Sequence, residues 1–400
     1  MPSDAFWVAF GADHYGRRPV ASDDPPVSLD VRPDEFFDLL VRACRARAFG
    51  PRDPHVRFFI AQREVLEDLD DYLPVPADGS LAGFLDRMED ELRGQPYLLT
   101  VQRMHVVSRH LWKRAAGFLA GLYEATGLLP GDAEVEAFVG RYPYTPTGIH
   151  RERSAVFVGA VQGQKDMLVW PPDTRGLPLQ SRHYDDVRAS AMHLHCAPGR
   201  LVYWPGMHWH VGQSPTPSAA LHVTVAEQPP DQAGLLAAAS GGVTLAAGKG
   251  LEYRSAAGLP AQYEELASAL TAAYGDADVV RDRLMVDWLR RRTGLGFTAP
   301  PPRRGSVELG DDDVVGLDGE FPIVLVSRDA RTNWCAADGR VARMRSAPAL
   351  SAAIDRLNSG WSLPVHEVLS LAASELELAL LRQALALLAD WQALAVTRSE

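Results

Sequence analysis

The chain has 400 residues, of which 46% are hydrophobic and 23% are charged, and its formal net charge is −11. This composition is typical of a folded protein of two or three domains and excludes a disordered or fibrous chain. The acidic balance also argues against a non-specific nucleic-acid binder, because affinity for phosphate needs clustered Lys and Arg.

The cysteines and the lengths of the apolar segments indicate in which cellular compartment the protein is expected. The three cysteines, Cys44, Cys196 and Cys335, are odd in number and far apart, so they do not make a disulfide framework. The opening residues lack a basic region followed by an apolar run, and no stretch approaches the ~20 apolar residues of a membrane span. We therefore expect a cytoplasmic protein whose thiols stay reduced.

The N-terminal part is predicted to be helical. Residues 1–30 are expected to form an arm laid over the core. Arg32–Arg42 has a Pro and acids at its start and an apolar stripe, which is the pattern of a helix. A second helix is predicted to begin after its cap, Ser80, and a third is predicted over Ser108–Glu124.

A barrel of strands is predicted from about Pro96 to Glu227. The stretch Ala155–Gln162 is apolar and rich in β-branched residues, which predicts a buried strand. Gly163-Gln164 is predicted to form a tight turn, and Lys165–Trp170 to be the returning strand.

A further turn and strand are predicted over Pro198–Pro205. Gly206-Met207 is then expected to turn the chain again and to place Trp209-His210 at the start of the next strand.

A set of metal-ligand residue types lies beside these strands, beginning with the segment 147–152. In extended chain, side chains two residues apart leave the same face, so His150 and Glu152 can reach one ion. A second imidazole would come from His208 or His210, which share a strand face. Two imidazoles and one carboxylate are the ligands of a facial-triad Fe(II) site, and they leave three positions open for a chelating 2-oxo acid and O2.

A cation completes the pattern. Lys165 follows His150 by fifteen residues, and a Lys at the closed end of a barrel can pair with the distal carboxylate of a 2-oxo acid. The hydroxyl of Thr147 can donate a second hydrogen bond. Only 3 of the 40 basic residues are Lys. Because this chain prefers Arg so strongly, a Lys at this position is not expected by drift.

Two other groups of residues could also hold a metal. His183-Tyr-Asp185 is a second pair of the same type, but no buried strand with a cation follows it, so we predict a loop. His193, His195 and Cys196 could form a zinc cluster with His208. Their spacing fits no common zinc motif, which favours ordinary strand residues at the barrel.

From Tyr142 to about Pro229 the chain resembles the JmjC-type Fe(II)/2-oxoglutarate oxygenases, in particular the cupin-like ribosomal oxygenase branch. The residues that carry the resemblance are Thr147-Gly-Ile-His150-Arg-Glu152, Val156-Phe157, Gln162-Gly-Gln-Lys165, Pro171-Pro-Asp173 and Pro198-Gly-Arg-Leu-Val-Tyr-Trp-Pro-Gly-Met-His-Trp-His210.

The resemblance implies a role for each of five residues. His150, Glu152 and His210 would bind Fe(II), which favours His210 over His208 as the third ligand. Lys165 and Thr147 would bind 2-oxoglutarate. The chain departs from the branch at Glu152, where the branch commonly has Asp, so its substrate need not be that of the branch.

The resemblance also implies the fold class, which is α+β. A double-stranded β-helix (jelly-roll, JmjC/cupin-like) core with N-terminal helices is expected over 1–229, a helical region over 230–298 and a winged-helix-like domain over 305–400. The helical region occupies the place of a dimerisation region in the branch; the alternatives are a homodimer and a helical bundle within one chain. Residues 299–304 are predicted to be a stiff linker, and a long Leu/Ala helix is predicted near Glu375–Val396.

The function that follows is an Fe(II)- and 2-oxoglutarate-dependent dioxygenase that hydroxylates a side chain in a protein or peptide, such as a ribosomal protein or a peptide natural-product precursor. The alternatives are a small-molecule hydroxylase of the same mechanism, a non-catalytic metal-binding cupin scaffold, and a zinc or manganese cupin with isomerase or hydrolase chemistry. We expect no membrane partner. Because Asp311–Asp313 lies on the last domain and no Lys does, we expect no nucleic-acid binding. Five aromatic residues are expected to be half core and half pocket wall: Tyr142, Tyr144, Trp170, Tyr203 and Trp209.

Overall fold

The computed structural model describes most of the chain. The described ranges are 2–23, 31–48, 53–129, 131–178, 184–227, 274–297, 299–305, 307–319 and 321–399, with the single positions 25, 268, 271 and 272. The chain divides into two compact units. Unit 1 comprises Met1–Pro229 and Leu295–Pro302, and unit 2 comprises Pro230–Gly294 and Arg303–Glu400. The predicted three-part division stays a prediction.

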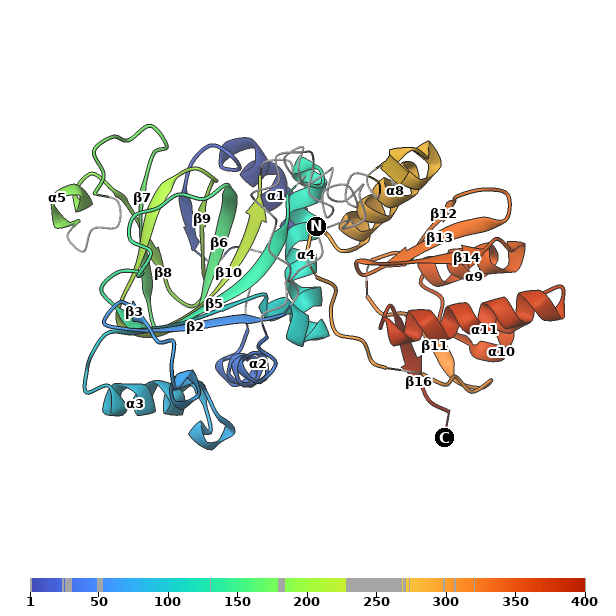
Figure 1. Cartoon of the computed structure of the whole chain (residues 1–400), viewed down its shortest axis with the longest axis horizontal. Coiled ribbons are helices and arrows are strands. Elements are labelled where there is room, and N and C mark those ends of the chain that lie inside the picture. The colour runs from blue at the N-terminus through green and yellow to red at the C-terminus, as the bar shows by residue number, and fades with distance from the viewer. Residues whose placement is uncertain are drawn as a thin grey trace, which may run out of the picture. The chain divides into compact units, whose positions relative to one another are not determined.

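Unit 1 is built on an antiparallel sheet of ten strands (Figure 1). Its main path runs in the order β1-β9-β6-β10-β5-β4-β2-β3, while β7 pairs with β10 and β8. The strands are β1 (Val20–Asp23), β2 (His55–Ile60), β3 (Arg63–Glu64), β4 (Tyr97–Gln102), β5 (Ala133–Tyr142), β6 (Ser154–Gln162), β7 (Lys165–Trp170), β8 (Met192–Cys196), β9 (Arg200–Trp204) and β10 (Trp209–Ala226). The sheet therefore starts well before Pro96, where the barrel was predicted to begin. The prediction missed β1 to β3, which lie at the two ends of the path.

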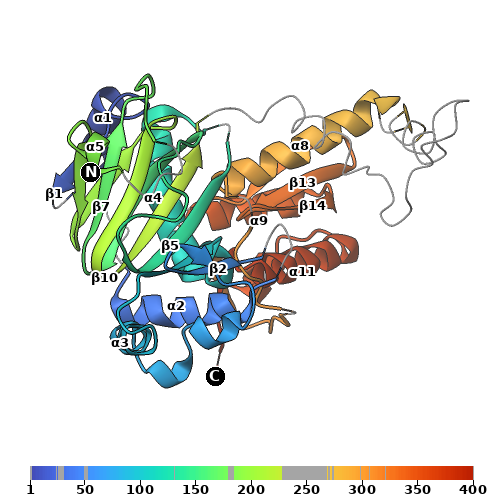
Figure 2. The same ribbon diagram turned by 60° about the vertical axis from the view of Figure 1, so that its left-hand side comes forward.

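The long strand β10 belongs to two sets of pairings. Its first half, Trp209–Gln213, pairs with β7, and its second half, Ser218–Ala226, pairs with both β5 and β6. The register shifts between Ser214 and Ser218, which marks an irregularity where the strand passes from one set to the other. Figure 2 shows β7, β10 and β5 following one another across this face.

The predicted hairpin of β6 and β7 is wrong in its pairing, although both strands exist. The chain turns at Gly163, whose φ is +70°, but β6 pairs with β9 and β10 while β7 pairs with β8 and β10. A Cβ at Gly163 would lie 2.5 Å from the Pro217 carbonyl oxygen. The turn therefore packs against the irregular part of β10, which separates the two strands.

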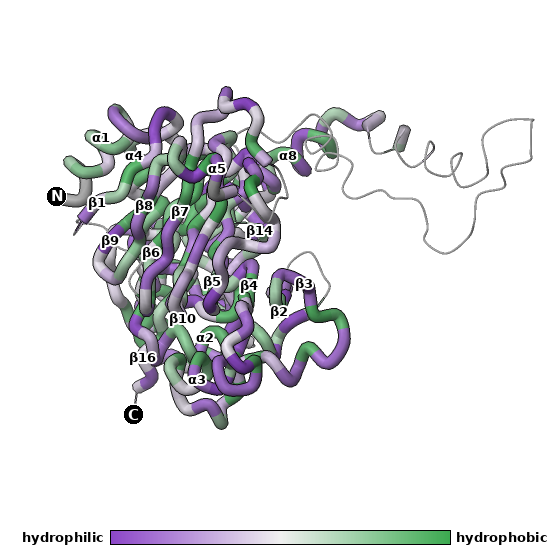
Figure 3. The backbone as a smooth tube through the Cα atoms, turned by 90° about the vertical axis from the view of Figure 1, so that its left-hand side faces the viewer, coloured by the Kyte–Doolittle hydropathy of each residue, from purple (hydrophilic) through white to green (hydrophobic). Residues whose placement is uncertain are grey.

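Side chains alternate between two faces along these strands, as a period of two requires. On β6, Val156 and Val158 join an inner cluster with residues of β7, β8 and β9. Phe157 points the other way, toward Trp7 and Phe118, with ring centroids at 6.1 and 5.1 Å. Figure 3 shows the alternation as bands of green and purple along the strands.

Helices cover the outer face of the sheet (Figure 1), and the Phe157 ring packs against aromatic rings of these helices. The N-terminal arm holds α1 (Pro2–Asp13), which the sequence did not predict, and it packs on α4 (Arg109–Thr126). Three predicted helices are confirmed, and two of them begin at serine caps whose hydroxyls accept backbone N–H groups, Ser80 from Gly83 and Ser108 from Leu111. The remaining helices of unit 1 are α2 (Pro33–Arg45), α3 (Leu81–Glu91), α4 (Arg109–Thr126), α5 (Asp185–Arg188) and the 3₁₀ turns η1 (Leu69–Tyr72), η2 (Pro76–Asp78) and η3 (Met104–Val107).

The start of the predicted linker belongs to unit 1. Residues 295–302 lie with this unit, and the Ala133 N–H donates to the Gly296 carbonyl at 2.8 Å. The Phe297 ring lies 4.7 Å from the buried His105 ring. These contacts anchor the residues just before the predicted linker, 299–304, and the stiffness of the linker stays a prediction.

Unit 2 has two small antiparallel sheets, ordered β15-β11-β16 and β12-β13-β14, around its own apolar core. The expected Leu/Ala helix ends at Asp390 rather than near Val396. Gln392 adopts a positive φ of 64°, which reverses the chain into a last strand. The elements are α8 (Ala277–Thr293), β11 (Val314–Leu317), β12 (Val324–Ser327), β13 (Thr332–Ala337), β14 (Arg340–Arg345), α9 (Pro348–Asn358), β15 (Leu363–Pro364), α10 (Val365–Leu369), α11 (Glu375–Asp390) and β16 (Leu394–Thr397).

The structure describes only part of the residues on which the predicted helical region and the absence of a membrane span depend. Within the predicted helical region, 230–298, the structure describes 268, 271, 272 and 274–297, and the homodimer stays a prediction. Leu284 and Trp288 are exposed on α8. In the part of the chain that the structure describes, no helix is long and apolar enough to cross a membrane.

Two glycines of α4 give a matched test of the α1–α4 packing. A Cβ at Gly121 would lie 2.2 Å from the Trp7 indole nitrogen, whereas a Cβ at Gly117 meets nothing within 4 Å. We expect Gly121→Ala to lower the free energy of unfolding by about 1–3 kcal/mol through overpacking. Gly117→Ala should raise it by about 0.5–1 kcal/mol through helix propensity. Urea unfolding of both variants measures this, and equal effects would contradict the packing of α1.

Candidate metal centre

Two segments far apart in the sequence meet at one point of unit 1. The His150 N–H donates to the His210 carbonyl at 3.1 Å, and the His210 N–H donates back to the His150 carbonyl at 2.8 Å. The Met207 N–H donates to the Glu152 carbonyl at 2.6 Å. This antiparallel bridge places the start of β10 beside the residues that lead into β6. Both imidazoles then leave the backbone on the same side.

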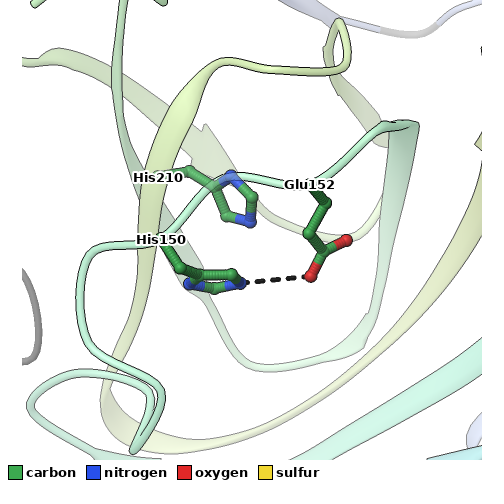
Figure 4. A group of neighbouring side chains, drawn as sticks. All are labelled: His150, Glu152 and His210. Carbon is green, nitrogen blue, oxygen red and sulfur yellow. Dashed lines mark hydrogen bonds and ion pairs between the residues drawn. The ribbon is translucent and has the colours of Figure 1, made fainter.

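The side chains of His150, Glu152 and His210 gather at this bridge (Figure 4). Their candidate ligand atoms all lie within 4.8 Å of one another. The His150 Nε2 lies 3.1 Å from the Glu152 Oε1. Ligands at ~2.1 Å from one ion lie about 3 Å apart, so a small inward movement would suffice. The three donors therefore fit a single divalent ion.

Hydrogen bonds select the tautomer of both histidines. The Nδ1 of His150 lies 3.0 Å from the Gly148 carbonyl oxygen, and the Nδ1 of His210 lies 3.0 Å from the His208 carbonyl oxygen. A carbonyl only accepts, so the Nδ1 of each ring carries a proton. The neutral ring of His210 then keeps a lone pair on Nε2, whereas the Nε2 of His150 faces the Glu152 carboxylate and would give up its proton to a metal ion. Such backbone partners orient metal-bound histidines in general.

The protonation states of His210 and Glu152 are those that metal ligands need. Burial and the neighbouring His150 lower the pKa of His210 to about 4, so this ring is neutral at physiological pH. Hydrogen bonding to His150 lowers the pKa of Glu152, which keeps the carboxylate charged. Burial acts to lower the pKa of His150, but its hydrogen bonds to Glu152 and to the Gly148 carbonyl outweigh burial and raise it.

Lys165 opens β7 and points into the same pocket as the cluster. It is 1% exposed, and its Nζ lies 2.8 Å from the Nε2 of His222 and 3.9 Å from the centre of the Phe138 ring. Burial lowers the pKa of Lys165 to about 7. Among the described residues, no carboxylate forms a hydrogen bond or ion pair with this Nζ. It is therefore a buried basic group whose charged form would gain from an incoming anion.

Thr147 also lines the pocket, on the loop before His150. Its hydroxyl donates to the Thr145 hydroxyl at 3.4 Å, and the Thr145 N–H donates to the Gly212 carbonyl at 2.8 Å. A Cβ at Gly212 would come within 3.2 Å of the Lys165 side chain. The five predicted residues therefore share one pocket, which encloses about 840 Å³ including its open mouth.

The structure adds polar residues that the sequence reasoning missed. Glu136 on β5 and His222 on β10 face the pocket and are direct cross-strand neighbours. Burial, with Glu152 and Glu134 nearby, raises the pKa of Glu136 to about 7. Polar residues that alternate with apolar ones, as in Ala133–Tyr142, were the available signal, but that signal alone is also typical of a solvent-facing strand side.

The expected aromatic walls are wrong for this pocket. None of the five aromatic residues named from the sequence lines it, whereas Trp204, Phe59 and Phe138 do. The reason is the strand period of two, because Tyr203 points toward α1 with its ring 4.8 Å from that of Phe10. Its neighbour Trp204 therefore points inward.

The other histidines are placed as strand residues. His195 on β8 bonds to the Asp166 carboxylate at 2.7 Å, and His193 bonds to the Arg188 carbonyl at 3.2 Å. Among the described residues they form no metal-ligating group with Cys196 or His208, so the zinc cluster is not formed there. His183 lies outside the described residues, and Asp185 begins the short helix α5.

Removing one imidazole at a time tests the ligand set. We expect His210→Ala to weaken Fe(II) binding at least ~100-fold, because the variant loses a ligand from a set of three. His208→Ala should bind as the parent does, since His208 supports His210 only through its backbone carbonyl. Competition with a chromophoric chelator under anaerobic conditions measures both. A loss of binding in His208→Ala alone would reverse the assignment.

The buried cation should cost stability. Between pH 7 and about 10.4 the unfolded chain keeps the Lys165 proton while the folded chain has lost it, so the parent gains stability as the pH rises through that window. We expect Lys165→Met to raise the free energy of unfolding by about 1–4 kcal/mol at pH 7. The gain should shrink at pH 9. Urea unfolding at the two pH values measures it, and a gain that does not change with pH would show that Lys165 keeps an ordinary pKa.

The chain was compared with family models, curated proteins and solved structures, and only the solved structures match it. No family model and no curated protein matches the chain. Two solved structures of YcfD, a ribosomal oxygenase from Escherichia coli, match at 14% and 13% identity, each with a TM-score of 0.50 and 98% coverage of both chains. A further structure of YcfD in complex with cobalt and 2-oxoglutarate matches at 14% identity with a TM-score of 0.48 and the same coverage.

At such identities the likeness concerns the fold. It extends over both compact units, because the coverage is 98% of each chain. The resemblance to the ribosomal oxygenase branch that the sequence predicted is thus confirmed at the level of the fold: the chain folds as the ribosomal oxygenase YcfD does.

Proposed function

We propose that this chain is an Fe(II)- and 2-oxoglutarate-dependent dioxygenase that hydroxylates a side chain of a protein or peptide. The observation that carries the proposal is one pocket that holds a His150–Glu152–His210 cluster together with a buried cation, Lys165. Either feature by itself would fit a different kind of protein. A metal-binding scaffold needs no buried Lys, and an anion site needs no cluster of three ligands.

Each protein group has a part in this reaction. When bound at the cluster, Fe(II) supplies the redox chemistry that couples the decarboxylation of 2-oxoglutarate by O2 to the oxidation of a substrate C–H bond. His150, Glu152 and His210 hold the ion and leave positions for the oxo acid. Lys165 and Thr147 bind its distal carboxylate, and the apolar walls Trp204 and Phe138 shield the centre from water.

The fold supports two further parts of the proposal. The division of β10 between two sets of strands favours a double-stranded β-helix for the core of unit 1, and the small sheets and helices of unit 2 favour a winged-helix-like domain. YcfD, whose fold the chain shares, is a ribosomal oxygenase. A protein substrate, with a ribosomal protein as its first candidate, is therefore part of the proposal.

The first test is optical. Fe(II) titrated anaerobically into the protein with 2-oxoglutarate should give a weak visible charge-transfer band, because the oxo acid chelates the ion. We expect no band in His210→Ala, which lacks a ligand, and none in Lys165→Met at the same 2-oxoglutarate concentration. His195→Gln, on the outside of the pocket, serves as the matched control and should give the full band.

The outcomes separate the proposal from its alternatives. A band that needs both residues supports the dioxygenase, and mass spectrometry of peptides after aerobic turnover would then seek an added oxygen atom. Tight metal binding without any band would contradict the use of 2-oxoglutarate. The protein would then be better described as a metal-binding scaffold.

A further inference from the structure

Lys165 and His222 form a pair that the proposed ligand set does not use. Lys165 comes from the first position of β7 and His222 from the second half of β10, and their Nζ and Nε2 atoms lie 2.8 Å apart. The two side chains are 1% and 5% exposed. A direct contact between two basic side chains in the interior is unusual, because both cannot be charged there.

The neighbours of the pair hold it rigidly. The His222 ring stacks on the Phe138 ring at 4.2 Å with 24° between their planes, and the Lys165 Nζ lies 3.9 Å above the same phenyl ring. The Phe138 ring thus contacts both members of the pair. Because the imidazole is fixed by stacking, it can fix the direction of the ammonium group.

The charges around the pair do not neutralise it directly. The groups that act on Lys165 or His222 are Glu136 on β5, Cys196 on β8 and His210 on β10. Burial and Lys165 hold the pKa of His222 well below its usual range, and burial lowers the pKa of Lys165 to about 7. The imidazole is therefore a neutral acceptor, and the pair carries at most one positive charge.

We propose that His222 is a positioning residue for Lys165: its Nε2 accepts a hydrogen bond from the Lys165 amino group and directs the remaining N–H groups into the pocket. The pair then takes up one proton from solvent when a carboxylate binds. The inference rests on the proposed function, since the carboxylate is the distal one of 2-oxoglutarate.

The position of the pair explains why a Lys serves here. An Arg could not give up its proton and would stay charged in an empty pocket. A Lys beside a neutral imidazole can lose its charge when no anion is present and regain it in the complex. The Lys165 amino group then binds a proton when the carboxylate binds beside it, because the anion stabilises the charged form of the amine.

Calorimetry measures this uptake without turnover. Mn(II)-loaded protein is titrated with 2-oxoglutarate in two buffers of different ionisation enthalpy, at pH 6 and at pH 8. We expect uptake close to one proton per 2-oxoglutarate at pH 8, where the free Lys165 is mostly neutral, and close to none at pH 6. Affinity should fall by up to about tenfold from pH 7 to pH 8.

Variants of His222 separate positioning from folding. His222→Leu removes the acceptor and should weaken 2-oxoglutarate binding about tenfold, while Mn(II) binding stays as in the parent. His222→Gln offers an amide oxygen in place of Nε2 and should restore the affinity to within about threefold. His195→Gln, the same change on β8 outside the pocket, should alter neither.

The failures of the two proposals are distinguishable. Binding at pH 8 without proton uptake, or full affinity in His222→Leu, would overturn the role of His222 and leave the dioxygenase in place. If the Mn(II)-loaded parent does not bind 2-oxoglutarate at either pH, the proposed function itself fails.

Discussion

The pairing of β10 is the constraint on which the rest of unit 1 depends. One half of this strand pairs with β7 and the other half with β5 and β6, so a single run of backbone joins three of the strands that line the pocket. His210 lies at one end of the strand, beside His150, and His222 lies in the other half, beside Lys165. The metal cluster and the anion anchor are therefore held by one element, which limits how far each can move relative to the other.

This arrangement places a basic side chain, Lys165, in the interior of unit 1. Lys165, Met167 and Val169 share the inner face of β7, so the position that opens the strand belongs to the core by the same alternation that buries its neighbours. A buried lysine with no carboxylate at hydrogen-bond distance among the described residues departs from what stability alone would select. Such departures are expected at functional sites, where binding of a ligand offsets them.

Much of the site could be predicted because it rests on local chemistry. The i, i+2 spacing of His150 and Glu152, the glycine turns and the rarity of Lys in this chain are all visible in the sequence, and the structure brings the five named residues to one pocket. Glu136 and His222 could not be identified in the same way. Their role depends on which face of β5 and β10 is closed, and a polar residue in an alternating strand faces solvent more often than a pocket.

The sequence by itself determined the residue types, the helices with serine caps and the strands around the ligand segments, because propensity, capping and alternation act over a few residues. Only the tertiary structure decided that β6 and β7 pair with β10 and not with each other, and that Trp204 rather than Tyr203 walls the pocket. It also brought His222 to Lys165, 57 positions away. Such contacts join distant segments, and their geometry depends on which strands pair with one another, which patterns over a few residues do not decide.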